Sequence, residues 1–469
     1  MLFSSSVFII VFLPLLFLCY FIVPGKFLRI KNLVLLVFSL IFYAFGGVKY
    51  LGLFSASILI NYFGGLLAGL PEKKSVRKLW LIVAMVLDLG LLAYFKYAGF
   101  FMQSISSLGF DVSVPQIVLP IGISFFTFQG ASYVIDVYRG DAKTQKNPLN
   151  VALYIALFPQ LIAGPIVRYT TIEEEITKRE HSIERFAEGL TRFMLGFGKK
   201  MILANSMGYI ADKAFSSEQM SVSFAWLGAI AYTFQIYFDF SAYSDMAIGL
   251  GRIFGFDFLE NFNYPYIARS VTDFWRRWHI SLSSWFRDYV YIPLGGNRCS
   301  KSRHIFNLMV VWALTGLWHG ANWTFVVWGV YFGIILIVEK YITGKFLDKI
   351  PCVFGHIITL IIVIVSWVLF RADSISGAFI YLKSMFSGDL HSPQTTYYLT
   401  EYLPEFILCI VACLPIKVWL EKFFANKADS KFFGAVYTIA PKLFAAIVFV
   451  LGYFKLASGS FNPFIYFQF

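Results

Sequence analysis

The sequence predicts an all-α polytopic membrane protein, and three observations carry that prediction. Hydrophobic residues make up 58% of the 469 residues, charged residues make up 14%, and the mean hydropathy is +0.69. A soluble domain carries about 25% charged residues, so this chain has too little polar surface to coat a globule in water. Aromatic residues reach 19%, which suits rings packed between membrane helices. We therefore expect about ten to twelve transmembrane helices, with re-entrant and interfacial helices, around a central cavity.

The excess of basic residues has an ordinary explanation in such a protein. Lysine and arginine number 39 against 27 aspartate and glutamate, a net charge of +12. Basic loops face the cytoplasm and contact anionic membrane lipids. No nucleic-acid partner is expected, because the chain has no recognition module and no long basic run. The five cysteines are scattered and form neither a disulfide framework nor a zinc spacing, so no metal site is predicted.

A membrane helix needs about 20 mostly apolar residues, and many stretches qualify. No lysine or arginine precedes the first stretch, so we interpret it as a retained span rather than a signal peptide. The expected spans are Ser5–Val23, Leu33–Gly47, Tyr50–Leu70, Leu79–Phe101, Ile117–Val137, a proline-broken Val151–Val167, Gly189–Ile210, Phe224–Ile253, Gly355–Phe370, Pro404–Leu420 and Ala440–Leu456. The stretch 305–338 would measure about 50 Å as one helix, too long for one crossing. We expect two helices there, meeting near Trp318, His319 and Gly320.

The distribution of basic residues predicts the orientation in the membrane. The loops 26–31, 73–78 and 139–146 are rich in lysine and arginine, and alternating spans place all three on one side, the cytoplasm. The stretches 102–115 and 387–402 contain neither residue and fall outside. The N- and C-termini are then extracytoplasmic. We expect one integral domain over residues 1–469, in a bacterial cell membrane.

The longest polar stretch, residues 257–304, is expected to form an ordered cytoplasmic layer. Within it, residues 273–280 place Phe274, Trp275 and Trp278 on one stripe with arginines beside them, which predicts an amphipathic interfacial helix. Pro293 and the paired glycines that follow indicate a tight turn.

His319 is the residue in this chain most suited to carry chemistry. An ionisable group within lipid costs several kcal/mol, so it needs a partner or a function. His319 lies near the expected helix break with Gly316, Gly320 and Ala321 around it, so a ligand or a neighbouring helix can approach the imidazole closely. Two interpretations stay open, a histidine bonded within a helix pair and a histidine that lines a cavity.

Two further candidates come from the same reasoning. His279 follows Arg276, Arg277 and Trp278, and it is either a ligand or catalytic residue or a histidine at the headgroup level. On the expected span 224–253, a polar stripe lines a wet cavity or pairs with an arginine of the polar layer; its members are Gln235, Asp239, Tyr243 and Met246. Phosphate loops, nucleophile elbows, zinc helices and dinucleotide turns are missing from the sequence. Group transfer and transport remain.

Five segments carry a resemblance to a known family. They are Leu119–Gln129, Leu157–Ile166, Phe274–Leu282, Trp285–Tyr289 and Gly316–Gly320. In this order they resemble the membrane-bound O-acyltransferases, in the bacterial branch that includes the alginate O-acetyltransferase membrane subunit and the teichoic-acid D-alanyl transferase. The start Met1-Leu2-Phe3 and the end Asn462–Phe469 look like the alginate side of that branch. The resemblance implies the membrane helix bundle of that family, with His319 as the catalytic histidine and His279 as the second histidine.

The function expected from this resemblance is O-acetylation of an exported or cell-wall polysaccharide. The acetyl donor would be a cytoplasmic thioester, acetyl coenzyme A or an acyl carrier protein, with no bound cofactor. His319 would act as general base on the acceptor hydroxyl. Residues expected to bind donor or substrate are Arg276, Arg277, Trp278, Arg287, Asp239, Tyr243 and Asn322. The expected partners are membrane lipids and an extracytoplasmic SGNH-hydrolase-like acetyltransferase.

Two other functions stay open at this point. One is transfer of D-alanine or another acyl group from a carrier protein to teichoic acid. The other is a transporter or flippase of lipid-linked sugars, in which His319 relays protons.

Overall fold

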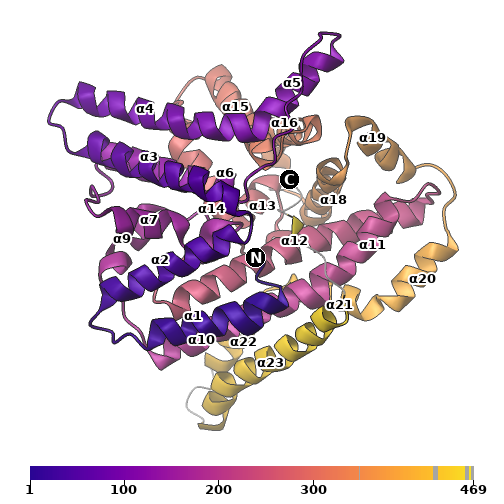
Figure 1. Ribbon diagram of the computed structural model, residues 1–469. Helices are drawn as coiled ribbons and strands as arrows, with labels where there is room; N and C mark the ends of the chain where they lie inside the picture. Colours follow the sequence, from indigo (N-terminus) through magenta and orange to yellow (C-terminus); the bar gives the residue numbers. More distant parts are fainter. Residues whose placement is uncertain (348, 426–430, 460–463, 466–469) are drawn as a thin grey trace. The chain divides into compact units, whose positions relative to one another are not determined.

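The computed structural model describes residues 1–347, 349–425, 431–459 and 464–465, and every regular element within these ranges is a helix (Figure 1). The predicted all-α fold class is confirmed. The chain forms two compact units: unit 1 comprises Met1–Phe193 and Ser244–Leu259, and unit 2 comprises Met194–Tyr243 and Glu260–Phe469. The single domain expected over residues 1–469 stays a prediction.

Unit 1 holds the helices of the N-terminal part of the chain and the end of one later helix. Its elements are η1 (Phe8–Phe12), α1 (Leu13–Phe21), α2 (Leu28–Ala44), η2 (Val48–Tyr50), α3 (Leu51–Gly69), α4 (Lys74–Leu92), η3 (Ala93–Tyr97), α5 (Ala98–Ser107), α6 (Ile123–Arg139), α7 (Pro148–Ala156), α8 (Phe158–Leu161), α9 (Tyr169–Thr177) and most of α10 (Ile183–Gly198). The last residues of α12 (Val222–Ile253) also belong to this unit.

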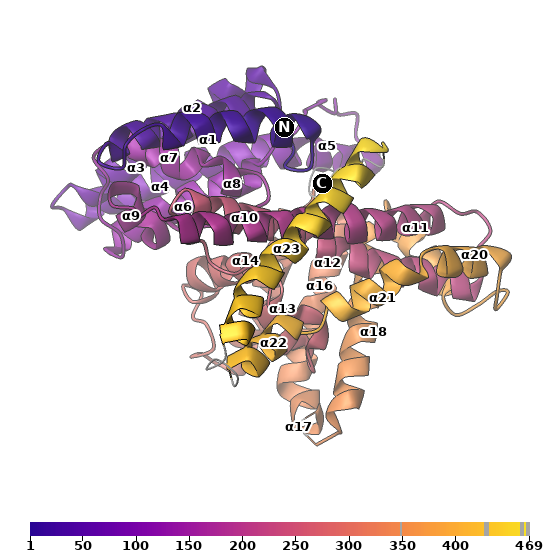
Figure 2. The same cartoon turned by 90° about the horizontal axis from the view of Figure 1, so that it is seen from below.

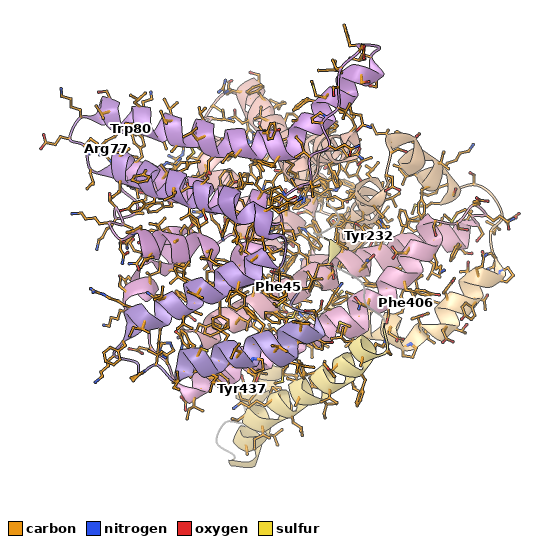
Figure 3. The ribbon with its side chains drawn as sticks, viewed as in Figure 1. Phe45, Arg77, Trp80, Tyr232, Phe406 and Tyr437 are labelled. Carbon is orange, nitrogen blue, oxygen red and sulfur yellow. The ribbon has the colours of Figure 1, made fainter. Side chains whose placement is uncertain are left out.

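Small residues set the close packing of α3 against α4 and α6 (Figure 1). A Cβ atom added at Gly64 would lie 2.8 Å from the Cβ of Ala84, and one at Gly65 would lie 2.4 Å from the ring of Tyr133. Such glycines let helix backbones approach closely inside a membrane. Arg77, at the start of α4, donates to the carbonyl oxygens of Ala68 and Tyr138 at 2.7 and 3.0 Å (Figure 3). It thereby satisfies backbone acceptors at the ends of α3 and α6.

Unit 2 holds the remaining elements. They are η4 (Lys199–Ala204), α11 (Asn205–Phe215), most of α12, η5 (Pro265–Ile267), α13 (Val271–Arg277), α14 (Ile280–Phe286), η6 (Arg287–Tyr291), α15 (Lys301–His319), α16 (Trp323–Val338), η7 (Glu339–Thr343), α17 (Gly344–Leu347), α18 (Cys352–Arg371), α19 (Ile375–Ser384), α20 (Pro393–Glu401), α21 (Leu403–Ala412), α22 (Ile416–Ala425) and α23 (Lys431–Ala457).

The helices α15 and α16 form the closest pair in this unit. A Cβ atom at Gly316 would lie 2.3 Å from the carbonyl oxygen of Phe325, and one at Gly329 would lie 2.3 Å from that of Trp312. Only glycine fits at these two positions. The helix α18 runs beside α16 on another side (Figure 2), and α13 packs on both. The core between these helices is aromatic, and its members include Phe274, Trp275, Trp278, Trp312, Trp328, Phe332 and Trp367.

Several helices are long and apolar enough to cross a membrane. Among the described residues they are Val48–Gly69, Lys74–Ser107, Trp323–Thr343, Cys352–Arg371 and Gly434–Ala457. The pair Leu403–Ala412 and Ile416–Phe423, bent by 61°, makes a sixth if it counts as one span. Other expected spans coincide with helices that are shorter, such as α2 and α6 with 17 residues each, or that contain buried charges, such as α12.

Two breaks in the helices bear on the expected elements. α15 ends at His319 and α16 begins at Trp323, so the helix break lies at the residues where the length of the stretch predicts it. The expected amphipathic helix over residues 273–280 is shorter than predicted, because α13 ends at Arg277 and a turn follows at Trp278 and His279. Its apolar stripe is buried in unit 2, with Phe274 and Trp278 at 1% and 2% exposure.

Candidate active site

His319 lies at the last position of α15, within a shell of aromatic rings. The residue is 7% exposed, and Gly320 continues the chain in an extended conformation. The imidazole meets the rings of Trp318, Trp328 and Phe370 edge-on, with centroids 5.1, 5.0 and 5.2 Å away. These rings exclude bulk water from the imidazole.

His279 occupies the turn between α13 and α14. Its φ angle is +45°, in the left-handed region that costs a non-glycine residue free energy and is often found at functional sites. The side chain is 1% exposed, and its Nδ1 lies 3.1 Å from Oδ1 of Asn261. Burial lowers the pKa of His279 well below its usual range, and a positive charge on His319 would lower it further. His279 is therefore neutral at pH 7.

The structure brings the two predicted histidines together across one indole ring. The ring centroid of Trp318 is 5.8 Å from that of His279 and 5.1 Å from that of His319. The histidines are 40 positions apart in the sequence (319 − 279), and they come from different helices of unit 2. Two buried imidazoles so close to each other can accept and pass on protons.

The carboxylate of Glu339 fixes the start of α13, the helix that leads to His279. The sequence does not indicate this role of Glu339. Glu339 accepts hydrogen bonds from the backbone N–H groups of Val271 and Thr272, at 2.8 and 2.9 Å. Ser270 caps the same helix by accepting from the N–H of Asp273 at 3.1 Å. A carboxylate at a helix N-terminus satisfies free donors and complements the helix dipole. No sequence spacing indicates Glu339, because it is 68 residues from Val271.

The arginines expected to bind the acyl donor differ in their surroundings. Arg277 donates from Nε to Asp273 at 2.8 Å, one helical turn away, and Arg287 donates from Nε to Asp288 at 2.6 Å. Arg276 and Arg298 are exposed. Trp278 is buried, and its ring packs 4.9 Å from that of Trp367, so it serves the core of unit 2.

The polar stripe on α12 forms a buried ion pair. Asp239 lies 2.5 Å from Nζ of Lys200, with both side chains 2% exposed, and it accepts a hydrogen bond from the N–H of Ile465 at 2.6 Å. The ring of Tyr243 packs 5.2 Å from that of Phe464. Of the two interpretations of this stripe, the structure thus shows pairing with a cation, although the cation is a lysine of η4 rather than a residue of the polar layer.

Asn322 caps a helix in this structure. Its Oδ1 accepts from the N–H of Thr324 at 3.0 Å, and its Nδ2 donates to the carbonyl oxygen of Asp373 at 3.1 Å. Both ends of the amide are therefore engaged at the start of α16, close in sequence to His319.

Comparison with known proteins shows which sequences this chain resembles. The sequence model of the membrane-bound O-acyltransferase family matches residues 141–380, which include both histidines. The chain is 41% identical to the probable alginate O-acetylase AlgI of Azotobacter vinelandii over the full length of both chains. It is 38% identical to the peptidoglycan O-acetyltransferase of Helicobacter pylori, over 82% of this chain and 80% of that one.

A more distant relative matches part of the chain. The teichoic acid D-alanyltransferase of Bacillus subtilis is 32% identical over 47% of this chain and 59% of its own length. The apolar helices and these matches together make the chain a multi-pass membrane acyltransferase. It belongs to the membrane-bound O-acyltransferase family.

Proposed function

We propose that this protein transfers an acetyl group from a thioester to a hydroxyl group, for the O-acetylation of an exported or cell-wall polysaccharide. The observation that carries the proposal is the pair of buried histidines on either side of Trp318. The names of the relatives that match most of the chain, an alginate O-acetylase and a peptidoglycan O-acetyltransferase, support the acetyl group and the polysaccharide.

His319 acts as the general base in this proposal. Its neutral imidazole takes the proton of the acceptor hydroxyl while the hydroxyl oxygen attacks the thioester carbonyl carbon. The new C–O bond forms, the C–S bond breaks, and the proton passes from the imidazole to the departing thiolate. The aromatic shell of Trp318, Trp328 and Phe370 keeps water from competing as the nucleophile.

Acetyl coenzyme A or an acylated carrier protein supplies the acetyl group, from the cytoplasmic side. The exposed guanidinium groups of Arg276 and Arg298 suit phosphates or an acidic protein face. Arg277 and Arg287 are already paired with carboxylates, so they contribute less to donor binding than the sequence predicts.

The orientation rests on the loops rich in basic residues. With residues 26–31, 73–78 and 139–146 in the cytoplasm, the termini lie outside, and an acceptor or an SGNH-hydrolase-like partner meets the protein on that side. The terminal Phe469 itself lies outside the described residues. Single cysteines in the loops 73–78 and 387–402, in a background without the five native cysteines, test this. An impermeant thiol reagent should label only the second loop in intact cells, and labelling of the first would invert the topology.

Acyl transfer by the purified protein tests the function itself. The protein in detergent receives radiolabelled acetyl coenzyme A, acetylated carrier protein or D-alanylated carrier protein, with a short oligosaccharide as acceptor. We expect acetyl transfer by the wild type and none by His319→Ala, with His391→Ala as the control from an exposed loop. Transfer of D-alanine alone would favour the teichoic acid reaction. Turnover of no thioester would favour a transporter of lipid-linked sugars.

A further inference from the structure

Asn261 makes an unusually complete set of contacts around His279. Its Oδ1 accepts from the backbone N–H of Ser281 at 3.2 Å and from the hydroxyl of Ser281 at 2.9 Å, and it lies 3.1 Å from Nδ1 of His279. Asn261 is 0% exposed. A backbone N–H can only donate, so the atom that it faces is the amide oxygen. The ring nitrogen that faces the same oxygen must then carry a proton.

The position of that proton decides what the other nitrogen can do. A neutral imidazole carries one proton, and with the proton on Nδ1 the Nε2 atom keeps its lone pair. Within the described residues, Nε2 of His279 is buried and has no hydrogen-bond partner. The ring of His279 stands perpendicular to that of Phe240, with centroids 4.6 Å apart. Its centroid lies 5.8 Å from that of the Trp318 ring. A buried acceptor without a partner costs free energy, which a substrate group would relieve.

The backbone holds this geometry in place. The carbonyl oxygen of Asn261 accepts from the N–H of Ile280 at 3.0 Å, and the N–H of Asn263 donates to the carbonyl oxygen of Arg277 at 2.9 Å. The segment 261–263 therefore clamps the turn on both sides of His279. These bonds maintain the left-handed conformation of His279.

We propose that Asn261 is a positioning residue that holds His279 as the tautomer protonated on Nδ1, so that Nε2 accepts a hydrogen bond from a donor group of the substrate. That group is either a hydroxyl of the acceptor or an amide N–H of the pantetheine arm of the acyl donor. His279 in this tautomer has no proton on Nε2 and cannot donate to the oxyanion of the intermediate. The inference about the substrate rests on the proposed acyl transfer, whereas the inference about the tautomer does not.

Nuclear magnetic resonance of the protein labelled with ¹³C and ¹⁵N in histidine tests the tautomer directly. The His279 signal, assigned by its loss in His279→Gln, should show a neutral ring protonated on Nδ1. Asn261→Leu should shift this signal toward the tautomer protonated on Nε2, and Asn261→Asp, which keeps an acceptor oxygen, should restore it. A wild-type ring protonated on Nε2, or an unchanged tautomer in Asn261→Leu, would overturn the proposal.

Activity measurements identify the substrate group. Asn261→Leu should lower kcat for acetyl transfer by about 10- to 100-fold, as for other residues that orient a functional side chain. Asn261→Asp should stay within a few-fold of wild type, and so should the control His391→Ala, which changes an exposed loop. If Nε2 accepts from the pantetheine arm of the acyl donor, Asn261→Leu should also raise KM for the thioester. This KM is measured in the slow hydrolysis of the thioester when no acceptor is present. If Nε2 accepts from the acceptor hydroxyl, that hydrolysis is unchanged.

Two outcomes separate this inference from the proposed function. A wild-type protein that transfers no acyl group but shows the Asn261-dependent tautomer would refute the function and support the positioning role. A wild-type protein that transfers acetyl normally, with kcat unchanged in a folded Asn261→Leu, would refute the positioning role alone. If Asn261→Leu is not recovered as a monodisperse protein, Asn261→Ala, which also removes the acceptor oxygen, serves in both measurements.

Discussion

A buried carboxylate of unit 1 and a buried imidazole of unit 2 differ in how their acceptors are engaged. In unit 1, Asp88 of α4 accepts from the hydroxyl of Ser57 at 2.9 Å on one carboxylate oxygen and from Nδ2 of Asn61 at 2.8 Å on the other. In unit 2, of the two ring nitrogens of His279, Nδ1 has a hydrogen-bond partner among the described residues and Nε2 has none. A buried group with every acceptor engaged clamps two helices together, whereas one that keeps an open lone pair can bind a ligand.

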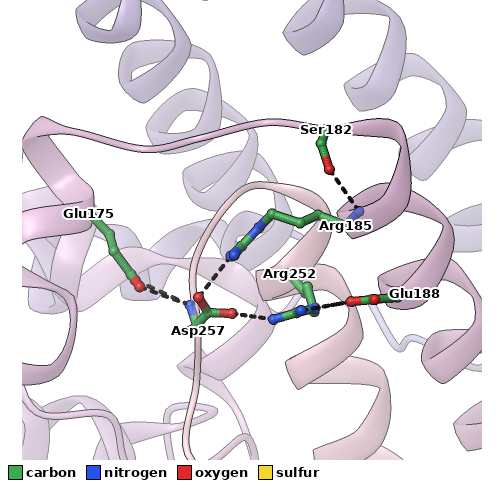
Figure 4. Close-up of polar contacts among 6 residues, drawn as sticks. All are labelled: Glu175, Ser182, Arg185, Glu188, Arg252 and Asp257. Carbon is green, nitrogen blue, oxygen red and sulfur yellow. Dashed lines mark hydrogen bonds and ion pairs between the residues drawn. The ribbon is translucent and has the colours of Figure 1, made fainter.

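The charged groups of unit 1 follow the same rule. Figure 4 shows Arg252 between Glu188 and Asp257, with Arg185 on the other oxygen of Asp257; the ion pairs measure 2.7, 2.7 and 2.8 Å. Glu175 accepts from the N–H of Asp257 at 3.2 Å. Each charge in this network has a partner within unit 1. The network therefore joins α9 and α10 to the end of α12 and the residues that follow it.

The largest expected effect is a difference in acyl transfer between a variant of His319 and a variant of Asp88. His319→Ala should lower acyl transfer by at least about 100-fold, because a general base contributes about 10² to 10⁴ in rate. Asp88→Asn should keep most of the activity, since it keeps the shape of the clamp and changes no group of unit 2. Both variants should insert and purify alike, and acetyl transfer in detergent is the measurement. Equal loss in both variants would erase the distinction between the units.

The next effect concerns the buried ion pair of unit 2. Lys200→Met leaves the carboxylate of Asp239 buried without its cation, which should cost about 3 to 5 kcal/mol of stability. The double variant Lys200→Met with Asp239→Leu should recover much of that loss, because no charge is left buried. Thermal unfolding in detergent measures both. A double variant as unstable as the single one would mean that the pair does more than balance two charges.

A smaller effect is expected where Glu339 caps α13. Glu339→Ala removes the acceptor of two backbone N–H groups, and loss of a helix cap costs about 1 kcal/mol. Since α13 leads into the turn of His279, acetyl transfer should fall a few-fold as well. Glu339→Gln, which keeps one acceptor oxygen, is the matched control and should lie between Glu339→Ala and wild type in both measurements.

The smallest effect is a pH dependence in unit 1. Burial, with the charges of Lys31 and Arg179, lowers the pKa of His181 to about 4. The unfolded chain takes up a proton near pH 6.5 but the folded protein does not until about pH 4, so stability is lost as pH falls between these values. His181→Gln lacks this proton uptake. The melting temperature of the wild type should therefore fall more than that of the variant between pH 6.5 and 4, and equal slopes would contradict the assignment.

The sequence predicted the helical fold and the helix break at His319. It did not predict what surrounds the two histidines. Composition gives the helix class, and the length of residues 305–338 gives the break at His319. The spacing of apolar residues did not indicate the turn at His279. The stripe of Phe274, Trp275 and Trp278 predicts a helix that runs on through residue 280. That turn depends on bonds to Asn261, 18 residues earlier in an irregular segment. No helical or strand period links such positions.

The sequence indicated the partners of its charged residues only where they lie close in the chain. The stripe with Asp239 left open a wet cavity or pairing with an arginine; the structure pairs Asp239 with Lys200, about which spacing on α12 carries no information. In the sequence, Arg276, Arg277 and Arg287 were equal candidates for donor binding. In the structure, Arg277 and Arg287 are held by Asp273 and Asp288, and the spacing of four residues could have indicated the first of these pairs.

The glycine contact between α15 and α16 also bears on how the protein is made. The two helices are joined by only three residues, 320–322, so little chain entropy is lost when they pair. Residues 301–338 can therefore pair as a helical hairpin before α18 and Phe370 pack against them. Within that hairpin, Trp318 and Trp328 already shield His319 from lipid. A larger residue at Gly316 or Gly329 would thus act first on the amount of protein that reaches the membrane, and only then on the turnover of the molecules that do.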